Sequence, residues 1–516
     1  MDSRGFKNEP QIDWTIETNR VTMLEALGTV ANNCGEYPFL IGGKAFRGEQ
    51  KIESFDPADN RRCVGIINVP SEEQIELAGK IALQAVVPNA EKRIEILKIA
   101  ASKLRDKKFE LAAWIVYEVS KPWNEALAEI NEAIDFCELY AIAAAAYMEK
   151  KKYQGWICAE ENFIFWRSRG PTAAISTWNF PVSLSVEKIA ASFAAGCPIL
   201  YKPAEQSPVT GWKVVECFLE SGVPENMLAY LPGRKEVGAA LVKSPYISQI
   251  TFTGSREVGE KIKREASRYP GKFGIKEVDA EMGGNNPIIV STSAILDLAI
   301  KGIVESKFGF NGQKCSALQR LIVIGDRPEL KQKLVEAAAS LEFGHPENPR
   351  YRHTALIDKE AFSRYNTGIT DLERFRQPVF KRYSLTQDNG WFVCPVIFDG
   401  VPNHRIQREI FGPALFILRT ENFQEAVCIA NDTDYALTAG VYTEYYSEIH
   451  YALEHLKAGN LYINRKITGA VVGRQPFGGF KYSGTGGKKV GLVERLEFFM
   501  VPVSTSINKE RHGVLV

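Results

Sequence analysis

The sequence predicts an α/β protein built from two successive halves in which strands alternate with helices. In the first half, three short apolar runs end in polar, proline or glycine residues, and stretches of helical periodicity separate them. These runs lie at 172–178, 197–203 and 248–255. The alternation restarts after residue 284, with apolar runs at 287–290, 321–324, 414–418, 439–442 and 460–464. Because this spacing is typical of parallel sheets with helical crossovers, we expect two such units that meet near residue 282.

Shorter patterns predict the remaining elements. Residues 1–70 are mixed and turn-rich, which indicates an N-terminal arm with short strands. Helices are expected where small and apolar residues recur at helical spacing, at 74–86, 97–104, 130–141, 184–195 and 258–266. Residues 498–506 alternate enough to form a terminal strand, and such a strand often pairs with a partner chain.

The composition is that of an ordinary globular protein. Of the 516 residues, 24% are charged and 45% are apolar, and 63 basic residues against 62 acidic ones give a net charge of +1. This balance provides no electrostatic basis for binding nucleic acid or an anionic membrane. The N-terminus lacks the apolar core of a signal peptide, and no run of about 18 apolar residues occurs. We therefore expect a cytoplasmic protein.

The cysteines and histidines do not suggest a metal centre. The nine cysteines are scattered and include no Cys-x-x-Cys pair, so neither a zinc site nor a disulfide framework is expected. The six histidines include no i, i+4 pair that could chelate a metal from one helix face. A reducing compartment fits this cysteine usage best.

Cys315 lies in residues 308–320, where a glycine-rich polar turn gives way to more apolar chain. A thiolate is a strong nucleophile, and a flexible backbone lets a reactive carbonyl group come close to it. The alternative is that Cys315 is one more small buried hydrophobic residue, as free cysteines usually are.

Polar side chains near other strand ends can complement such a thiol. The amide N–H of Asn179 can donate to a developing oxyanion, or the residue can simply cap a turn. Glu281 precedes the glycine pair 283–284, and a partly buried carboxylate there can act as a general base; otherwise it is an exposed loop acid. Glu409 and Phe411 can hold the ribose and the ring face of a nicotinamide, or form a structural turn.

Two further segments could bind a nucleotide. Gly254 and Ser255 join a strand to a helix, and the free N–H groups of a helix start suit a pyrophosphate, although Ser255 as a plain N-cap explains the pattern equally. Lys202 and Glu205 follow a strand end and could hold the hydroxyls of an adenosine ribose. Glu205 would repel a 2′-phosphate, which favours NAD over NADP; the alternative for this pair is a surface salt bridge.

These segments together resemble the aldehyde dehydrogenase superfamily along nearly the whole chain. Seven motifs occur in the family's order: Trp178-Asn-Phe-Pro181, Lys202-Pro-Ala-Glu205, Phe252-Thr-Gly-Ser255, Glu281-Met-Gly-Gly284, Gly312-Gln-Lys-Cys315, Glu409-Ile-Phe-Gly-Pro413 and Pro476-Phe-Gly-Gly479. Within the superfamily the chain is most similar to the Δ1-pyrroline-5-carboxylate dehydrogenases, also called L-glutamate γ-semialdehyde dehydrogenases. The segments that carry this closer resemblance are 281–284, 309–317, 468–470 and 476–485.

The resemblance implies the aldehyde dehydrogenase fold and its division into parts. A Rossmann-like NAD-binding domain is expected from 1–150 and 172–281, an α/β catalytic domain from 282–485, and a small β oligomerisation segment from 151–171 and 486–516. NAD is the implied cofactor and a small aldehyde the implied substrate. A homo-oligomer that assembles through the C-terminal strand is implied as well.

The resemblance also implies roles for individual residues. Cys315 would form a thiohemiacetal and then a thioester, Asn179 would stabilise the oxyanion, and Glu281 would activate the water that releases the acid. The expected cofactor contacts are Trp178, Lys202, Glu205, Gly254, Ser255, Gly283, Glu409 and Phe411. The expected substrate contacts are Ser316, Gly469 and Ala470 for the α-carboxylate, Phe180 and Phe477 for the aliphatic stem, and Glu132 nearby. The implied reaction is the NAD-dependent oxidation of L-glutamate γ-semialdehyde to L-glutamate in proline degradation.

Alternatives to this reaction stay open at the level of the sequence. The substrate could be another semialdehyde or aldehyde, or the chain could be a non-catalytic binding or structural protein on the same fold. A CoA-acylating enzyme is disfavoured, since that branch of the superfamily typically lacks the glutamate found at 281. The segment 486–491 departs from the family's pattern, which bears on the packing of the C-terminal part.

Overall fold

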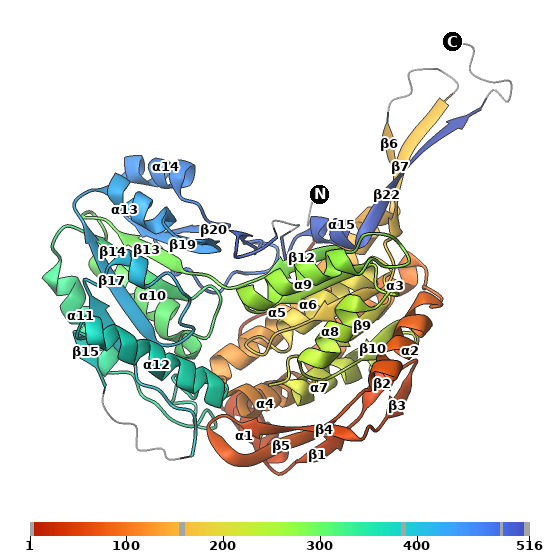
Figure 1. Ribbon diagram of the computed structural model, residues 1–516, viewed down its shortest axis with the longest axis horizontal. Coiled ribbons are helices and arrows are strands. Elements are labelled where there is room, and N and C mark those ends of the chain that lie inside the picture. The colour runs from red at the N-terminus through yellow and green to blue at the C-terminus, as the bar shows by residue number, and fades with distance from the viewer. Residues whose placement is uncertain (1–4, 154–159, 383–388, 486–488, 510–516) are drawn as a thin grey trace.

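The computed structural model describes residues 5–153, 160–382, 389–485 and 489–509. Two large sheets with parallel cores dominate these residues, and helices pack around each sheet (Figure 1). The first sheet is built before residue 282 and the second after it, which confirms the predicted α/β class and the seam between the two halves.

The first sheet has the strand order β12-β11-β8-β9-β10-β2-β3. Its strands are β12 (Glu277–Glu281), β11 (Gln249–Thr253), β8 (Thr172–Ile175), β9 (Ile199–Lys202), β10 (Leu228–Tyr230), β2 (Phe39–Ile41) and β3 (Lys44–Phe46). The strands from β12 to β10 are parallel, and β2 and β3 form an antiparallel rim. Strands β8 and β9 are buried along their whole length, because helices cover both faces of a parallel sheet.

Helices α2 to α9 accompany this sheet: α2 (Glu72–Leu83), α3 (Ala90–Asp106), α4 (Lys108–Val119), α5 (Trp123–Met148), α6 (Ser183–Ala194), α7 (Pro208–Glu220), α8 (Lys235–Lys243) and α9 (Arg256–Arg268). Their starts follow local chemistry. Ser71 and Gln74 form a reciprocal capping box before α2, in which each side chain accepts from the other residue's backbone N–H. Pro208 opens α7 at a position where the missing N–H costs nothing.

The second sheet has the order β15-β16-β17-β14-β13-β19-β20. Its strands are β15 (Phe380–Lys381), β16 (Val396–Asp399), β17 (Ala414–Thr420), β14 (Leu318–Ile324), β13 (Asn286–Val290), β19 (Thr438–Tyr442) and β20 (Asn460–Ile463). Side chains alternate between its two faces, since Ile288 and Val290 join one hydrophobic cluster and Ile289 joins the other. Both faces are therefore packed. The helices beside this sheet are α10 (Leu296–Phe308), α11 (Pro328–Ala339), α12 (Lys359–Phe375), α13 (Phe423–Asn431) and α14 (Tyr446–His455).

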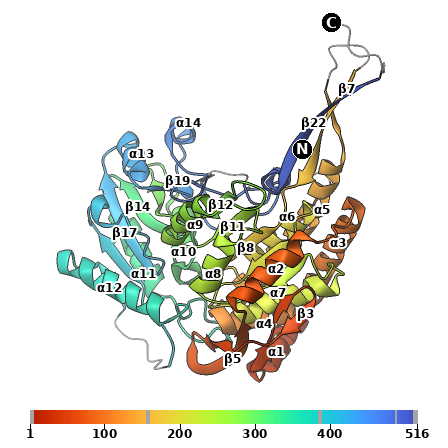
Figure 2. The same ribbon diagram turned by 45° about the vertical axis from the view of Figure 1, so that its right-hand side comes forward.

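A narrow third sheet projects from the body of the molecule (Figures 1 and 2). It has the order β22-β7-β6, with β22 at Met500–Asn508, β7 at Glu160–Ser168 and β6 at Lys151–Tyr153. The predicted terminal strand exists, and it pairs along its length with β7 of its own chain. Parts of the predicted oligomerisation segment, at 154–159, 486–488 and 510–516, lie outside the described residues, as does the first half of the unusual segment 486–491.

The N-terminal arm departs from its prediction in one element. Its short strands are confirmed, with β1 (Gly35–Tyr37), β5 (Asp59–Val69) and β4 (Gln50–Asp56) forming a small sheet. A helix, α1 (Glu17–Ala31), precedes them and was not predicted. It buries only Met23, Leu27 and Val30, while exposed apolar residues such as Leu24 blur its periodicity.

The expectation of unpaired cysteines was wrong for one pair. Cys34 and Cys63 form a disulfide, with their Cα atoms 5.8 Å apart. Parallel pairing of β1 with β5, in which Gly35 lies opposite Gly65, brings these two cysteines together, and no local spacing could reveal this.

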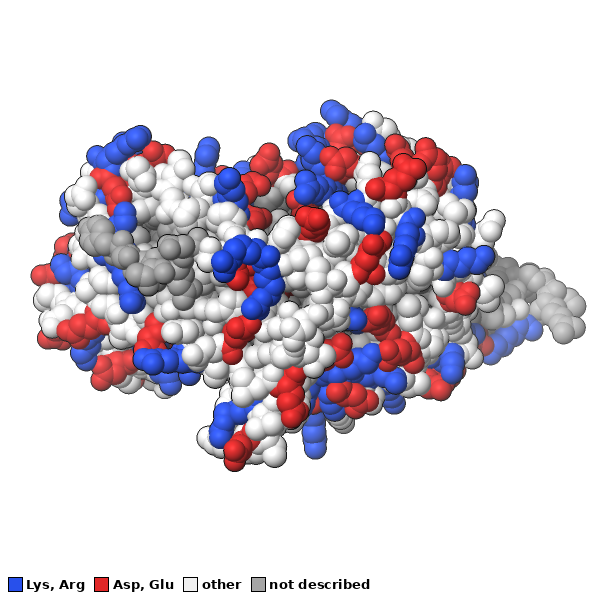
Figure 3. All heavy atoms as spheres, turned by 90° about the horizontal axis from the view of Figure 1, so that it is seen from below, with Lys and Arg blue, Asp and Glu red and all other residues white. Residues whose placement is uncertain are grey.

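The surface matches the near-zero net charge. Lysine and arginine alternate with aspartate and glutamate over the face seen in Figure 3, without a large region of one sign. In the described ranges, no helix is both long enough and apolar enough to cross a bilayer.

Candidate active site

The candidate site lies where the two large sheets meet. Strand β12 ends at Glu281, and after four residues the chain enters β13 of the second sheet. Cys315 precedes β14, the parallel neighbour of β13. The carboxyl end of one sheet therefore faces the amino ends of strands in the other, and this junction brings Glu281 close enough to Cys315 to influence its ionisation.

The loop that carries Cys315 has an unusual backbone. Phe310 and Asn311 have φ values of 48° and 53°, in the left-handed region that residues other than glycine rarely adopt. The Asn311 amide donates to the carbonyl of Thr354, and Gln313 donates to Ala355 O at 3.3 Å. Such strain persists only where surrounding contacts hold it, and it is common at functional sites.

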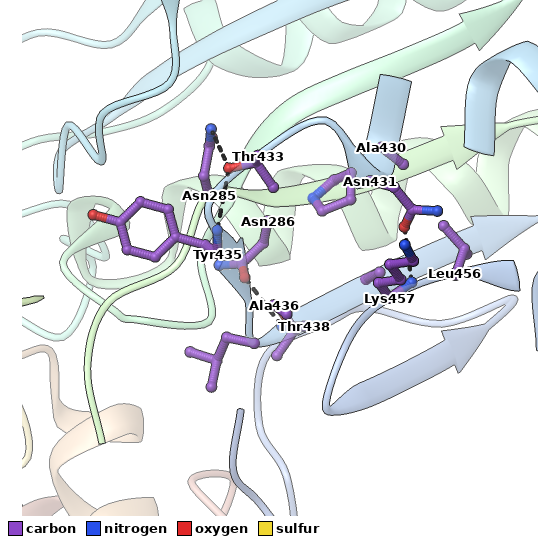
Figure 4. Close-up of a pocket in the computed structure, with 13 residues that line it drawn as sticks. Asn285, Asn286, Ala430, Asn431, Thr433, Tyr435, Ala436, Thr438, Leu456 and Lys457 are labelled. Atoms are coloured by element: carbon purple, nitrogen blue, oxygen red, sulfur yellow. Dashed lines mark hydrogen bonds between the residues drawn. The ribbon is translucent and has the colours of Figure 1, made fainter. Parts of the chain in front are cut away.

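Asn286 fixes the loop from the side of β13. Its Nδ2 donates to the carbonyl oxygens of Cys315, at 2.7 Å, and of Ala317, at 2.9 Å. Its Oδ1 accepts from the backbone N–H of Thr438 at 3.1 Å, and Figure 4 shows this bond beside a cavity of about 10 Å³ between β13 and β19. A Cβ on Gly284 would lie 2.7 Å from the Cys315 carbonyl oxygen, so only glycine fits there.

Cys315 itself is a protonated thiol in this environment. Burial raises its pKa to about 12, and the nearby carboxyls of Glu409 and Glu281 act in the same direction. Asn179 lies on the other side of the loop, where its Nδ2 donates to Gln313 O at 3.0 Å and its Oδ1 accepts from Thr177 at 3.1 Å. Because an amide carries two N–H donors, one remains for a substrate oxygen.

The carboxyl of Glu281 is a second titratable group, close to the Cys315 thiol. Its Oε2 is buried and accepts no hydrogen bond among the described residues. Burial raises the pKa of Glu281 to about 8, with the like charge of Asp279 as the next cause and Arg495 and Lys188 acting against it. A carboxyl with such a pKa is poised to exchange a proton near neutral pH.

The predicted nicotinamide contacts gather next to this pair. The Gly284 N–H donates to Glu409 Oε1 at 3.2 Å, and a Cβ on Gly283 would lie 2.0 Å from Glu409 Oε2. Burial raises the pKa of Glu409 to about 7. Phe411 has a positive φ of 52°, and its ring contacts the Trp178 ring edge-on with 5.7 Å between centroids.

The remaining predicted cofactor contacts lie along the carboxyl edge of the first sheet. Lys202 ends β9, where burial lowers its pKa to about 8 and the charge of Glu205 opposes this. Ser255 caps α9 directly after β11 and accepts from Val258 N at 3.4 Å, and Gly254 N–H donates to Glu281 O at 3.1 Å. Adjacent strand ends, a helix start and a lysine near a carboxylate fit a dinucleotide. Among described side chains, no His, Cys, Asp and Glu group gathers that could hold a metal ion.

The predicted substrate contacts surround the loop less tightly. Ser316 is 8% exposed, and its carbonyl oxygen accepts from Thr438 Oγ1 at 3.3 Å. Gly469, which precedes Ala470, has a φ of +73° and lies next to the Lys466 side chain. The charge of Lys466 acts on Glu125, which forms an ion pair with Lys314, the residue before Cys315. Phe180 and Phe477 are both half-buried, and a Cβ on Gly478, the residue after Phe477, would lie 3.1 Å from Glu281 Oε1.

The last predicted substrate contact, Glu132, lies on α5. Burial raises its pKa to about 7, the nearby Ser183 side chain acts against this shift, and the charge of Glu129 reinforces it. The structure therefore associates Glu132 with the start of α6 rather than with Cys315.

Comparison with known proteins adds to this geometry. A family model described as the aldehyde dehydrogenase family matches residues 45–504. The chain belongs to the aldehyde dehydrogenase family. The resemblance seen in the sequence motifs is thereby confirmed.

Individual relatives of this aldehyde dehydrogenase are similar over nearly its full length. The protein named 1-pyrroline-5-carboxylate dehydrogenase 1 from Halalkalibacterium halodurans is 38% identical over 496 residues, which are 94% of this chain and 96% of that one. A crystal analysis of 1-pyrroline-5-carboxylate dehydrogenase from Thermus with bound NAD matches with a TM-score of 0.93 and 38% identity, over 98% of this chain and 100% of that one. Proline utilization A from Bdellovibrio bacteriovorus matches with a TM-score of 0.96 and 37% identity over 100% of this chain. This chain spans 54% of that longer protein.

Two residues that position this aldehyde dehydrogenase site were missed in the sequence. Asn286 lies two residues after the predicted glycine pair, so its proximity was the available signal. No sequence signal indicated Lys121, because it lies at the junction of α4 and α5, far in sequence from Asn179. Its buried Nζ donates to Asn179 O and Glu129 Oε2, each at 2.6 Å, and lies 3.8 Å from the Phe180 ring centroid.

Proposed function

We propose that this chain is an NAD-dependent dehydrogenase that oxidises L-glutamate γ-semialdehyde to L-glutamate in proline degradation. The observation that carries the proposal is the meeting of Cys315, Glu281 and Asn179 at one junction, in a chain whose near-full-length relatives are named 1-pyrroline-5-carboxylate dehydrogenases. A thiol, an amide donor and a carboxyl are the groups that aldehyde oxidation through a thioester requires.

The first half of the reaction uses Cys315 and Asn179. Cys315 gives up its proton and its sulfur bonds to the aldehyde carbon, which makes a thiohemiacetal with a negatively charged oxygen. The free N–H of the Asn179 amide and the backbone N–H of Cys315 donate to that oxygen. Held by Glu409, Phe411 and Trp178, NAD would supply the hydride acceptor for that carbon, whose oxygen would then re-form a carbonyl as part of a thioester.

The second half uses Glu281. Ionised Glu281 removes a proton from a water molecule, whose oxygen attacks the thioester carbon. The carbon–sulfur bond then breaks, the carboxylic acid leaves, and Cys315 recovers a proton. With a pKa of about 8, the Glu281 carboxyl is partly ionised at neutral pH and more so above it, so hydrolysis should accelerate as the pH rises toward 8.

The residues that would hold NAD lie along the carboxyl edge of the first sheet and in the loop before β17 of the second sheet. Ser255 and the start of α9 would hold the pyrophosphate, Lys202 and Glu205 the adenosine ribose, and Glu409, Phe411 and Trp178 the nicotinamide half. Gly283 lets the carboxyl of Glu409 approach the backbone closely. In the same way, Ser316, Gly469 and Ala470 would bind the substrate α-carboxylate, with Phe180 and Phe477 flanking the stem and Glu132 behind them.

The division of the chain into parts belongs to the same proposal. Residues 1–150 and 172–281 form the NAD-binding domain, 282–485 the catalytic domain, and 151–171 with 486–516 the oligomerisation segment. A homo-oligomer that assembles through the projecting β22 follows from it.

The test is an assay of the purified chain with NAD and L-glutamate γ-semialdehyde. We expect NAD reduction with the wild type and none with Cys315→Ala, which should still bind NAD because its cofactor contacts are intact. A semialdehyde that lacks the amino group serves as a competitor substrate. A higher kcat/KM for that competitor would overturn the proposed substrate assignment. Absence of NAD reduction with every aldehyde would overturn the proposed dehydrogenase activity.

A further inference from the structure

Four charged side chains are buried together behind Glu281. Arg495, Glu187, Asp279 and Lys188 are each at most 2% exposed. Arg495 Nε donates to Glu187 Oε1 at 2.8 Å, and its Nη1 donates to Asp279 Oδ2 at 2.6 Å. Lys188 Nζ lies 3.5 Å from Glu187 Oε2. Charged groups are seldom buried this completely unless they are paired, and these four form one connected cluster.

The register of two parallel strands connects this cluster to Glu281. Asp279 and Glu281 are two residues apart on β12, so their side chains share one face of the sheet. Their partners on β11 are Thr251 and Thr253. The four side chains therefore form a polar patch on one face of the sheet.

Each threonine of this patch is bound by one cation of the cluster. Arg495 Nη2 donates to Thr251 Oγ1 at 3.2 Å. Lys188 Nζ donates to Thr253 Oγ1 at 2.7 Å. Arg495 thus binds Thr251, the strand partner of Asp279, and Lys188 binds Thr253, the strand partner of Glu281.

Two carboxylate oxygens of the patch have no hydrogen-bond partner among the described residues. They are Asp279 Oδ1 and Glu281 Oε2, and both are buried. An unpaired buried carboxylate oxygen is costly, and the cost is smaller when the carboxyl holds a proton.

Within the buried cluster itself, the charges balance without Glu281. Two cations, Arg495 and Lys188, match the two carboxylates Glu187 and Asp279, so ionised Glu281 leaves the cluster with one excess negative charge. The other titratable groups that face Glu281 are Lys489 and Cys315. Of these charges, Asp279 opposes the ionisation of Glu281, while Arg495 favours it.

We propose that Arg495 and Asp279 are positioning residues for Glu281, and that their buried ion pair sets how readily the Glu281 carboxyl gives up its proton. Neither residue touches the reacting atoms; they act through the shared face of β12. This inference rests on the proposed function, in which Glu281 activates the hydrolytic water.

Single substitutions should shift the pH profile in opposite directions. Asp279→Asn removes a like charge with little change of shape, so the pH at which thioester hydrolysis reaches half its maximal rate should fall by about one unit. Arg495→Met removes an opposite charge, so that pH should rise by about one unit. A merely structural role would lower stability in both variants and move neither midpoint.

The matched control is Asp399→Asn. Asp399 is 8% exposed and pairs with Arg419 Nη2 at 3.0 Å in the second sheet, away from Glu281. Loss of the Asp399 charge should leave the pH midpoint of thioester hydrolysis at its wild-type value. If Arg495→Met does not fold, the Asp279→Asn midpoint alone decides.

A second readout does not depend on turnover. The infrared band of the protonated Glu281 carboxyl, identified as the band that Glu281→Gln removes, is titrated in the wild type and in Asp279→Asn. A lower titration midpoint in Asp279→Asn supports the inference, and an unchanged midpoint, or shifts of the same sign in both charge variants, overturns it. If no aldehyde is oxidised, the proposed function fails while this titration still gives a result.

Discussion

The thiol of Cys315 faces two carboxyls, Glu281 and Glu409, and the residue is half-buried. Its pKa of about 12 means that the thiolate is a small fraction at neutral pH in the ligand-free chain. Reaction with an aldehyde then requires that the proton leaves as the sulfur attacks. In the proposed mechanism, the amide of Asn179 compensates by stabilising the oxyanion that this attack creates.

Alkylation of Cys315 by iodoacetamide should report this pKa. We expect the rate in the ligand-free protein to rise about tenfold per pH unit from pH 7 to 10 without a plateau, because only the thiolate reacts. The measurement is mass spectrometry of the Cys315 peptide over time.

The Glu281→Gln variant provides the control. Above pH 8 it lacks a nearby negative charge, so the pKa of Cys315 falls and alkylation at pH 9 should be faster than in the wild type. A plateau near pH 8.5 in the wild type would contradict the shifted pKa.

At the scale of elements, the loop before β14 depends on a side chain from β13. Asn286→Ala removes the donor to Cys315 O and Ala317 O and the acceptor for Thr438 N–H. Leaving such groups unpaired costs about 1–3 kcal/mol, so we expect the loop to shift and kcat to fall at least about tenfold. KM for NAD should change little. Steady-state kinetics with a denaturation midpoint measures both effects.

Asn422→Ala is the matched control for Asn286→Ala. Asn422 caps α13 in the same half of the chain by accepting from Glu425 N at 2.8 Å. Its loss should destabilise the protein by about 1 kcal/mol while kcat stays at the wild-type value. Equal losses of activity in the two variants would mean that stability, rather than the loop geometry, limits kcat.

The sequence predicts those elements that carry strong local patterns. The apolar runs around Ile288 and Leu321 and the periodicity around Ile262 gave β13, β14 and α9 directly. Helix α1 was missed because its apolar face is narrow. Strand order, the Cys34–Cys63 pair and the contact of Lys121 with Asn179 depend on tertiary packing, and one chain read residue by residue contains no signal for them.

The site residues divide in the same way. Motif residues such as Cys315, Glu281 and Asn179 carry a local signal, since each lies at or near the end of a strand at the junction. Arg495 and Asp279 become visible only when the strand register is known.

At the scale of the whole molecule, the projecting sheet of β6, β7 and β22 is the surface through which the proposed homo-oligomer would assemble. Three narrow strands bury little apolar surface on their own. Ile507 on β22 remains 44% exposed and Tyr153 on β6 remains 48% exposed. We therefore expect Ile507→Asp to reduce the assembly to smaller species, measured as molar mass by light scattering after size-exclusion chromatography.

The control for this prediction is Leu453→Asp. Leu453 is 56% exposed on α14, on a different part of the molecule from the projecting sheet (Figure 1). The Leu453→Asp variant introduces the same charge as Ile507→Asp and should leave the molar mass of the assembly unaltered. A wild-type molar mass for Ile507→Asp would exclude this strand from the interface.

The crossing between the two large sheets is only four residues long, from Met282 to Asn285. Glu281 belongs to the first sheet and the Cys315 loop to the second, so a small rotation of one sheet against the other alters the distance between them. In the proposed mechanism, any condition or ligand that changes the orientation of one sheet relative to the other would therefore affect both the attack of Cys315 on the aldehyde and the activation of water by Glu281, without a change in any side chain.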